Sequence, residues 1–151
     1  NGLYRVNRRG HFNVPMGRYA NPQICQETKL LAASSVLSVA TIEERDYRKV
    51  LDAAQAGDFV YFDPPYHPIS KTANFTAYTS KSFSEDDQAA LADVFAELDQ
   101  KGVQCMLSNS DTPFIRGLFD KFRTDTVLAP RAISRKSSGR KPVNEVVVRN
   151  Y

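Results

Sequence analysis

The sequence predicts an α/β protein whose sheet is mostly parallel and ends in an antiparallel strand. Apolar, strand-like runs alternate with helical segments through most of the chain, which is typical of this class. The last two strand-like runs, 123–129 and 144–151, are joined without a helix, so we expect them to be antiparallel. Before this part, residues 1–22 alternate apolar and polar side chains around Arg9-Gly10, which predicts a β-hairpin outside the sheet.

The remaining elements follow from local patterns. Ser84 and Asp87 have the spacing of a capping box, and Leu91, Phe95 and Leu98 share one face of the helix that follows. Lys101-Gly102 ends that helix. The other predicted elements are a helical segment at 23–33, strands at 35–40, 58–63 and 103–108, a helix or turn-helix at 43–56, and a short helix at 113–121.

Composition narrows the class of protein. The chain has 151 residues, of which 42% are hydrophobic and 25% charged, so it is long enough for one domain with its own core. No apolar run reaches the length of a membrane span, and no secretory signal is visible. Cys105 lies in an apolar run and is expected to be a buried thiol, and with two histidines in the chain we expect no metal site. These features favour a cytoplasmic protein.

Positive charge gathers in two segments although the net charge is only +3. Residues 1–22 hold four arginines and no acid, and residues 131–141 hold five basic side chains, Arg135 and Lys136 among them, again without an acid. Such segments suit an anionic partner such as a nucleic acid. The alternative is that both are ordinary solvated loops.

The segment "FDPPY" (62–66) begins with the last two residues of the predicted strand 58–63. In α/β sheets, ligands bind beyond the carboxyl ends of the strands, where Asp63 would lie. Proline has no N–H group, so Pro64 and Pro65 stiffen the backbone and leave carbonyl oxygens without local donors. Together with the ring of Tyr66, these acceptors suit an amino group on a flat ring. The alternative is a strand ended by prolines, with Asp63 capping a turn.

Longer stretches resemble a known family, the Dam-type (D12 class) DNA adenine-N6 methyltransferases. "FDPPYHPISKTANFTAYTSKSF" (62–83) resembles the catalytic motif and its loop, and "NGLYRVNRRGHFNVPMGRY" (1–19) resembles the DNA-recognition hairpin. "LSNSD" (107–111) and "RKPVNEVVVRNY" (140–151) are similar to later motifs. The resemblance implies a partial Rossmann-like methyltransferase fold, with 1–22 ending the target-recognition region and 23–151 forming the C-terminal part of the catalytic domain.

The resemblance also implies a reaction. A methyl group would pass from S-adenosylmethionine to the exocyclic amine of a flipped adenine in duplex DNA, usually within GATC. Asp63 and the Pro64 carbonyl would hold the amine, Pro65 would shape the loop, and Tyr66 would stack on the base. His67 is interpreted as polar loop surface.

DNA contacts are implied for the hairpin. Arg5 matches a guanine-reading position, where a guanidinium can bind O6 and N7 together. Leu3 and Pro15 match positions that contact the thymine methyl group. The remaining matched positions would lie beside the bases or position the DNA backbone: Asn7, Asn13, Arg18 and Tyr19. The alternative is that the apolar residues only pack the hairpin and the polar ones are solvated.

The cofactor assignment is less complete. Asp46-Tyr47 resembles an acidic–aromatic pair that contacts S-adenosylmethionine, with a helix-cap aspartate and a core tyrosine as the alternative. Asp63 would also border the cofactor. None of the seven glycines forms Gly-x-Gly, the phosphate-loop pattern that the family carries further upstream. We therefore expect a missing N-terminal segment, weak cofactor binding by this chain alone, and a strand 58–63 that either has an unpaired edge or pairs with 35–40.

Two other functions remain open from the sequence. The chain could be an inactive, truncated remnant that keeps only DNA binding. It could also belong to a methyltransferase that acts on RNA or on a protein amide, although the hairpin argues against this.

Overall fold

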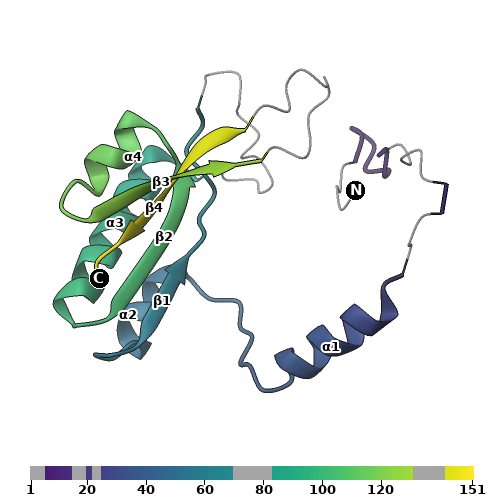
Figure 1. Ribbon diagram of the computed structural model, residues 1–151, viewed down its shortest axis with the longest axis horizontal. Coiled ribbons are helices and arrows are strands. Elements are labelled where there is room, and N and C mark those ends of the chain that lie inside the picture. Colours follow the sequence, from purple (N-terminus) through teal and green to yellow (C-terminus); the bar gives the residue numbers. More distant parts are fainter. Residues whose placement is uncertain (1–5, 15–19, 22–24, 70–82, 131–141) are drawn as a thin grey trace. The chain divides into compact units, whose positions relative to one another are not determined.

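The computed structural model describes residues 6–14, 20–21, 25–69, 83–130 and 142–151 (Figure 1). The chain divides into two units, Asn1–Glu44 and Arg45–Tyr151. A boundary at residue 22, between a recognition region and a catalytic domain, stays a prediction.

The first unit contains the predicted hairpin turn. Val6 and Phe12 form an antiparallel bridge, and the Gly10 amide donates to the Asn7 carbonyl at 2.9 Å. Gly10 has φ +78°, a conformation that glycine adopts without steric cost and that three-residue hairpin loops require. The Asn7 side chain accepts hydrogen bonds from the Arg9 and His11 amides, which fixes the turn from inside.

The predicted strand at 35–40 is wrong. Helix α1 spans Glu27–Leu37 and therefore includes the first three residues of the predicted strand, 35–37. The preceding residues, Glu27 to Ala33, are strong helix formers, whereas β-branched side chains favour a strand only when a neighbouring strand pairs with them. None of the described strands includes residues 35–40. The helix buries none of its residues, so local propensity rather than packing accounts for it.

The second unit is built on a four-stranded sheet in the order β1-β2-β4-β3. The strands are β1 (Phe59–Phe62), β2 (Gln104–Ser110), β3 (Arg123–Ala129) and β4 (Val143–Arg149). β1 pairs with β2 in parallel, and β4 is antiparallel to both β2 and β3. Strands β1, β2 and β3 therefore share one direction and the final strand opposes them, which confirms the predicted mixed sheet.

Helices cover one face of this sheet (Figure 1). The elements are the 3-10 helix η1 (Tyr47–Lys49), α2 (Val50–Ala53), α3 (Glu85–Gln100) and α4 (Pro113–Leu118). The predicted turn-helix at 43–56 is thus confirmed in a shorter form. Phe95 of α3 is fully buried against the rings of Phe62, Phe119 and Phe122. Cys105 is also fully buried, as expected, and burial raises its pKa to about 11.

The opposite face of the sheet and the β1 edge are open in the part of the chain that the structure describes. Phe59 and Tyr61 are 54% and 53% exposed, and β1 pairs only with β2. The expected unpaired edge is therefore present among the described strands, and residues 35–40 do not form the strand that was expected as its alternative partner. An open apolar strand edge is a surface on which another strand can add.

Helix α3 begins with the predicted capping box. The Ser84 hydroxyl accepts from the Asp87 amide, and the Asp87 carboxylate accepts from the Ser84 amide at 2.8 Å. The backbone and side-chain hydrogen bonds from Ser84 lower the pKa of Asp87. This cap fixes the start of the helix that faces the segment following β1.

We predict that Ser84→Ala lowers the free energy of unfolding by about 1 kcal/mol, because the Asp87 amide loses its acceptor. Urea denaturation monitored by circular dichroism measures this. The difference should shrink on acidification, since a carboxylate with a lowered pKa stabilises the fold at neutral pH and stops doing so as the pH falls through that pKa. Ser84→Thr keeps the hydroxyl and should behave like the wild type. Equal losses for Ala and Thr would exclude the cap as the cause.

Candidate active site

The Asp63-Pro64-Pro65-Tyr66 loop lies where the sequence predicts it, directly after the carboxyl end of β1. The end of β2 lies beside it because the two strands are parallel neighbours. β4 begins at this same end of the sheet, where Glu145 pairs with Ser110, the last residue of β2. Side chains from three strands can therefore reach the loop.

The Asp63 carboxylate is held by β2. The Ser108 hydroxyl donates to Asp63 Oδ1 at 2.9 Å, and the Tyr61 hydroxyl donates to Ser108 Oγ across 2.8 Å. Phe62 pairs with Leu107, so the next residues, Asp63 and Ser108, fall opposite each other and on the sheet face that Tyr61 shares. Oδ2 of Asp63 accepts no hydrogen bond from any described residue.

The backbone of the loop is held from the helical face. The Gln88 side chain of α3 donates to the Pro65 carbonyl at 2.8 Å, and the His67 amide donates to Asn109 Oδ1 at 2.9 Å. Asn109 also donates to Gln88 Oε1 at 3.1 Å, which joins the two contacts. The Pro64 carbonyl accepts no hydrogen bond among the described residues and is available to a ligand.

The interpretation of His67 as polar loop surface is wrong. Its side chain is only 14% exposed, and its ring stacks on Phe114 with the centroids 4.9 Å apart. One ring nitrogen lies 3.1 Å from the Thr112 hydroxyl and the other 3.2 Å from Glu85. The segment after Tyr66 folds back onto α3 and α4, and this burial of the ring could not be foreseen from a polar-looking loop.

Tyr66 is half-buried and neutral at physiological pH. Burial raises the pKa of its hydroxyl, the nearby charges of Glu145 and Asp63 raise it further, and an interaction with Ser108 opposes the shift only in part. A neutral phenol offers a flat apolar face, which suits stacking on an aromatic ligand.

The loop therefore presents two acceptors that no described residue engages, Asp63 Oδ2 and the Pro64 carbonyl, beside an aromatic ring. When other groups already hold the acceptors in place, the acceptors do not have to reorganise as charge develops on a bound ligand. This arrangement can bind an amino group through its hydrogens. It offers no donor from the prolines that could compete.

Asp46 and Tyr47 are occupied locally. The Asp46 carboxylate accepts from the Arg48 amide at 2.9 Å, which caps η1, and pairs with the Arg48 guanidinium at 3.2 Å. The Tyr47 ring packs edge-on against Phe83 with the centroids 6.3 Å apart. Both residues thus have the cap and core contacts of the alternative interpretation, and their contact with a cofactor stays a prediction.

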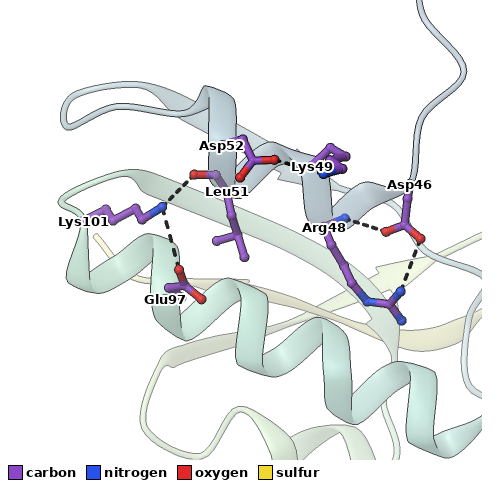
Figure 2. A pocket seen from close by; sticks show the side chains of 7 residues that line it. All are labelled: Asp46, Arg48, Lys49, Leu51, Asp52, Glu97 and Lys101. Carbon is purple, nitrogen blue, oxygen red and sulfur yellow. Dashed lines mark hydrogen bonds and ion pairs between the residues drawn. The ribbon is translucent and has the colours of Figure 1, made fainter.

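A shallow depression of about 490 Å³ lies beside Asp46, between η1-α2 and α3 (Figure 2). Its charges are paired with one another: Lys49 with Asp52 at 3.3 Å, and Lys101 with Glu97 at 3.7 Å. Lys101 also donates to the Leu51 carbonyl at 2.6 Å. Figure 2 shows these groups facing each other, so the depression is where α2 docks on α3.

Most predicted DNA contacts fall outside the described residues: Leu3, Arg5, Pro15, Arg18, Tyr19, Arg135 and Lys136. Asn13 is exposed, and Asn7 is exposed with its side-chain oxygen engaged in the hairpin turn. Ala129 of β3 and Val143 of β4 are paired with each other at the end of the sheet where β1 and β2 also finish.

The described ranges contain no helix that is both long and apolar enough to cross a membrane. Over the same residues, no group of three or more His, Cys, Asp or Glu side chains is placed to hold a metal ion.

Sequence reasoning missed the residues that support the loop: Tyr61, Gln88, Ser108 and Asn109. Two features of the sequence indicate three of these residues, Gln88, Ser108 and Asn109. "LSNSD" places three polar residues at the end of an otherwise apolar strand, and Gln88 lies three residues before Leu91 and seven before Phe95, on the core face of α3. A polar side chain at such a position requires a buried partner.

The chain matches known proteins over its whole length. Residues 1–133 match the model of the D12 class N6 adenine-specific DNA methyltransferases. The type II methyltransferase M1.LlaDCHI of Lactococcus lactis subsp. cremoris is 46% identical over all of this chain and 54% of its own length. DNA adenine methylases of Vibrio cholerae and Escherichia coli K12 are 40% and 37% identical, each over 97% of this chain and 53% and 52% of their lengths.

The chain thus spans about half the length of the curated relatives it matches. The family match covers the DPPY loop and the segment of β2 that holds it. On this evidence the chain belongs to the D12 class of N6 adenine-specific DNA methyltransferases.

Proposed function

We propose that this chain is the C-terminal part of an S-adenosylmethionine-dependent DNA methyltransferase that modifies the N6 amine of adenine in duplex DNA, within GATC. The observation that carries the proposal is the pair of free acceptors at the end of β1, Asp63 Oδ2 and the Pro64 carbonyl, in a chain of this family. Relatives named DNA adenine methylase support adenine as the target.

The chemistry of this pair suits an aromatic amine. The nitrogen lone pair of adenine is delocalised into the ring, which makes the amine a poor nucleophile. When Asp63 and the Pro64 carbonyl each accept one N–H, the nitrogen is turned so that its lone pair faces an electrophile. The surplus proton leaves after transfer, so no strong base is needed. Tyr66 would support the flipped base by stacking.

DNA would lie over the end of the sheet where β1 and β2 finish and where Asp63 lies. Ala129 and Val143, which are paired at this end of the sheet, precede and follow the basic segment 131–141 in the sequence, and the arginines of residues 1–22 would supply further cationic side chains. Arginine and lysine contacts to phosphates would position the duplex, and Arg5 would read guanine in the major groove.

S-adenosylmethionine, when bound, supplies the electrophilic methyl group. Asp46, which caps η1, and Tyr47, which packs against Phe83, would contribute to its site together with Asp63. We propose that a segment corresponding to the other half of the relatives completes this site. The open edge of β1 and the uncovered face beside it, with Phe59 and Tyr61 exposed, offer a surface for such a segment.

This proposal predicts complementation. The chain joined to the N-terminal half of the Lactococcus lactis relative should methylate GATC-containing DNA, whereas the chain alone should not. Protection of plasmid from a methylation-sensitive nuclease measures the activity, and calorimetry measures cofactor affinity. Micromolar S-adenosylmethionine binding by the isolated chain would contradict the division of the site. DNA binding without methylation in the joined protein would indicate an inactive remnant.

In the joined protein, Asp63→Ala should lower the rate of methyl transfer by at least about 100-fold and leave the dissociation constant for DNA nearly unchanged, because one acceptor of the transition state is lost. Ser108→Ala should lower the rate by about 10-fold, since the carboxylate is then free to rotate. Single-turnover kinetics separate the rate from binding.

Ser110→Ala is the matched control, because Ser110 lies two residues further along β2 on the same face. Its rate should equal that of the wild type. If Ser108→Ala and Ser110→Ala had the same effect, support of Asp63 by Ser108 would be excluded.

Arg5→Ala should reduce discrimination between GATC and a duplex with the guanine replaced, by roughly 1–3 kcal/mol, while binding to unrelated DNA persists. Fluorescence anisotropy at fixed salt concentration gives the ratio of affinities. Arg9→Ala, in the hairpin turn, should weaken both affinities alike. An unchanged ratio in Arg5→Ala would refute the recognition role, and tighter binding to structured RNA would favour an RNA substrate.

A further inference from the structure

Two buried amide side chains connect the core to the loop after β1. Gln88 of α3 is 1% exposed and Asn109 of β2 is 0% exposed. Their neighbours on the same helix and strand, Leu91 and Leu107, belong to the apolar core. A polar side chain costs free energy in such surroundings unless it is hydrogen-bonded, so the use of two amides here requires an explanation.

The backbone groups around the pair fix the direction of every hydrogen bond. Asn109 Oδ1 accepts from two amides, those of His67 at 2.9 Å and Ser110 at 2.8 Å. Its NH2 group must therefore face Gln88 Oε1, which leaves the NH2 group of Gln88 for the Pro65 carbonyl. A carbonyl can only accept, so the opposite orientation of Gln88 would place two acceptors together.

The two anchors lie on either side of Tyr66. Gln88 holds the carbonyl of Pro65, immediately before it, and Asn109 holds the amide of His67, immediately after it. The prolines provide no N–H group with which the loop could bond itself. The direction of the Pro64 carbonyl and of the Tyr66 ring thus depends on bonds donated or accepted by side chains outside the loop.

We propose that Gln88, through its bond to the Pro65 carbonyl and its link to Asn109, is a positioning residue for methyl transfer. The proposal rests on the proposed function, because it assigns Gln88 to the site that Asp63 and the Pro64 carbonyl would form. Gln88 does not touch the substrate: it sets the backbone from which the acceptors and the stacking ring project.

The first experiment uses the chain itself and needs no activity. Gln88→Met keeps the length of the side chain and removes both hydrogen bonds. Amide hydrogen exchange measured by NMR should show faster exchange at His67, while the core amide of Val148 stays as protected as in the wild type. Gln100→Met, the same change at the exposed end of α3, should leave His67 unchanged.

The second experiment uses the joined protein. Gln88→Met should lower the single-turnover rate of methylation by about 10- to 100-fold, because small displacements of reacting groups have effects of this size. The dissociation constant for GATC duplex should change less than about twofold, since the segments proposed to hold the rest of the duplex, residues 1–22 and 131–141, are elsewhere in the chain. Gln100→Met should match the wild type in both quantities.

The outcomes are separable. Loss of protection at Val148 together with His67 would assign Gln88 to the stability of the whole unit and overturn the proposal. Three other results would also overturn the proposal: an unchanged exchange rate at His67, an unchanged methylation rate, or a loss of DNA affinity as large as the loss of methylation rate. If the wild-type joined protein does not methylate adenine, the proposed function fails, and the exchange rates alone then decide whether Gln88 orders the loop.

Discussion

The two prolines after β1 set the constraint on which the site depends. They remove the backbone donors that would let the loop stabilise its own conformation, and the Pro64 carbonyl accepts no hydrogen bond from any described residue. The loop must then be ordered from outside. Here the order comes from Ser108, Asn109 and Gln88, which lie on the neighbouring strand and on the helix that covers it.

The alternation of side chains along β2 makes this support possible. Ser108 and Asn109 are consecutive and point to opposite faces of the sheet, so one holds the Asp63 side chain and the other holds the loop backbone. The loop crosses the end of the strand and is reached from both faces. Because these hydrogen bonds exist without a ligand, the acceptors would need little reorganisation on binding the amine of the proposed reaction.

The open face and edge of the sheet fit a chain that spans about half of its curated relatives. Phe59 and Tyr61 are exposed on β1, and the helices lie on the other face. Tyr61 also donates to Ser108, so a segment that packed against this face would bury the hydrogen-bond path that ends at Asp63. Packing of any further segment on this face and ordering of the carboxylate would therefore be physically linked.

Local patterns in the sequence determined the elements that local chemistry controls. The capping box at Ser84, the glycine turn at Gly10, the apolar strands and the DPPY loop at a strand end follow from side chains close together in the chain. The strand predicted at 35–40 is wrong because the helix formers that precede it carry α1 on to Leu37, against the strand preference of the two valines in 35–40. Only the tertiary structure decided that Gln88, 23 residues beyond Pro65, bonds its carbonyl, and that His67 is enclosed. Those contacts depend on the register of β1 on β2 and on the docking of α3, which no local pattern specifies.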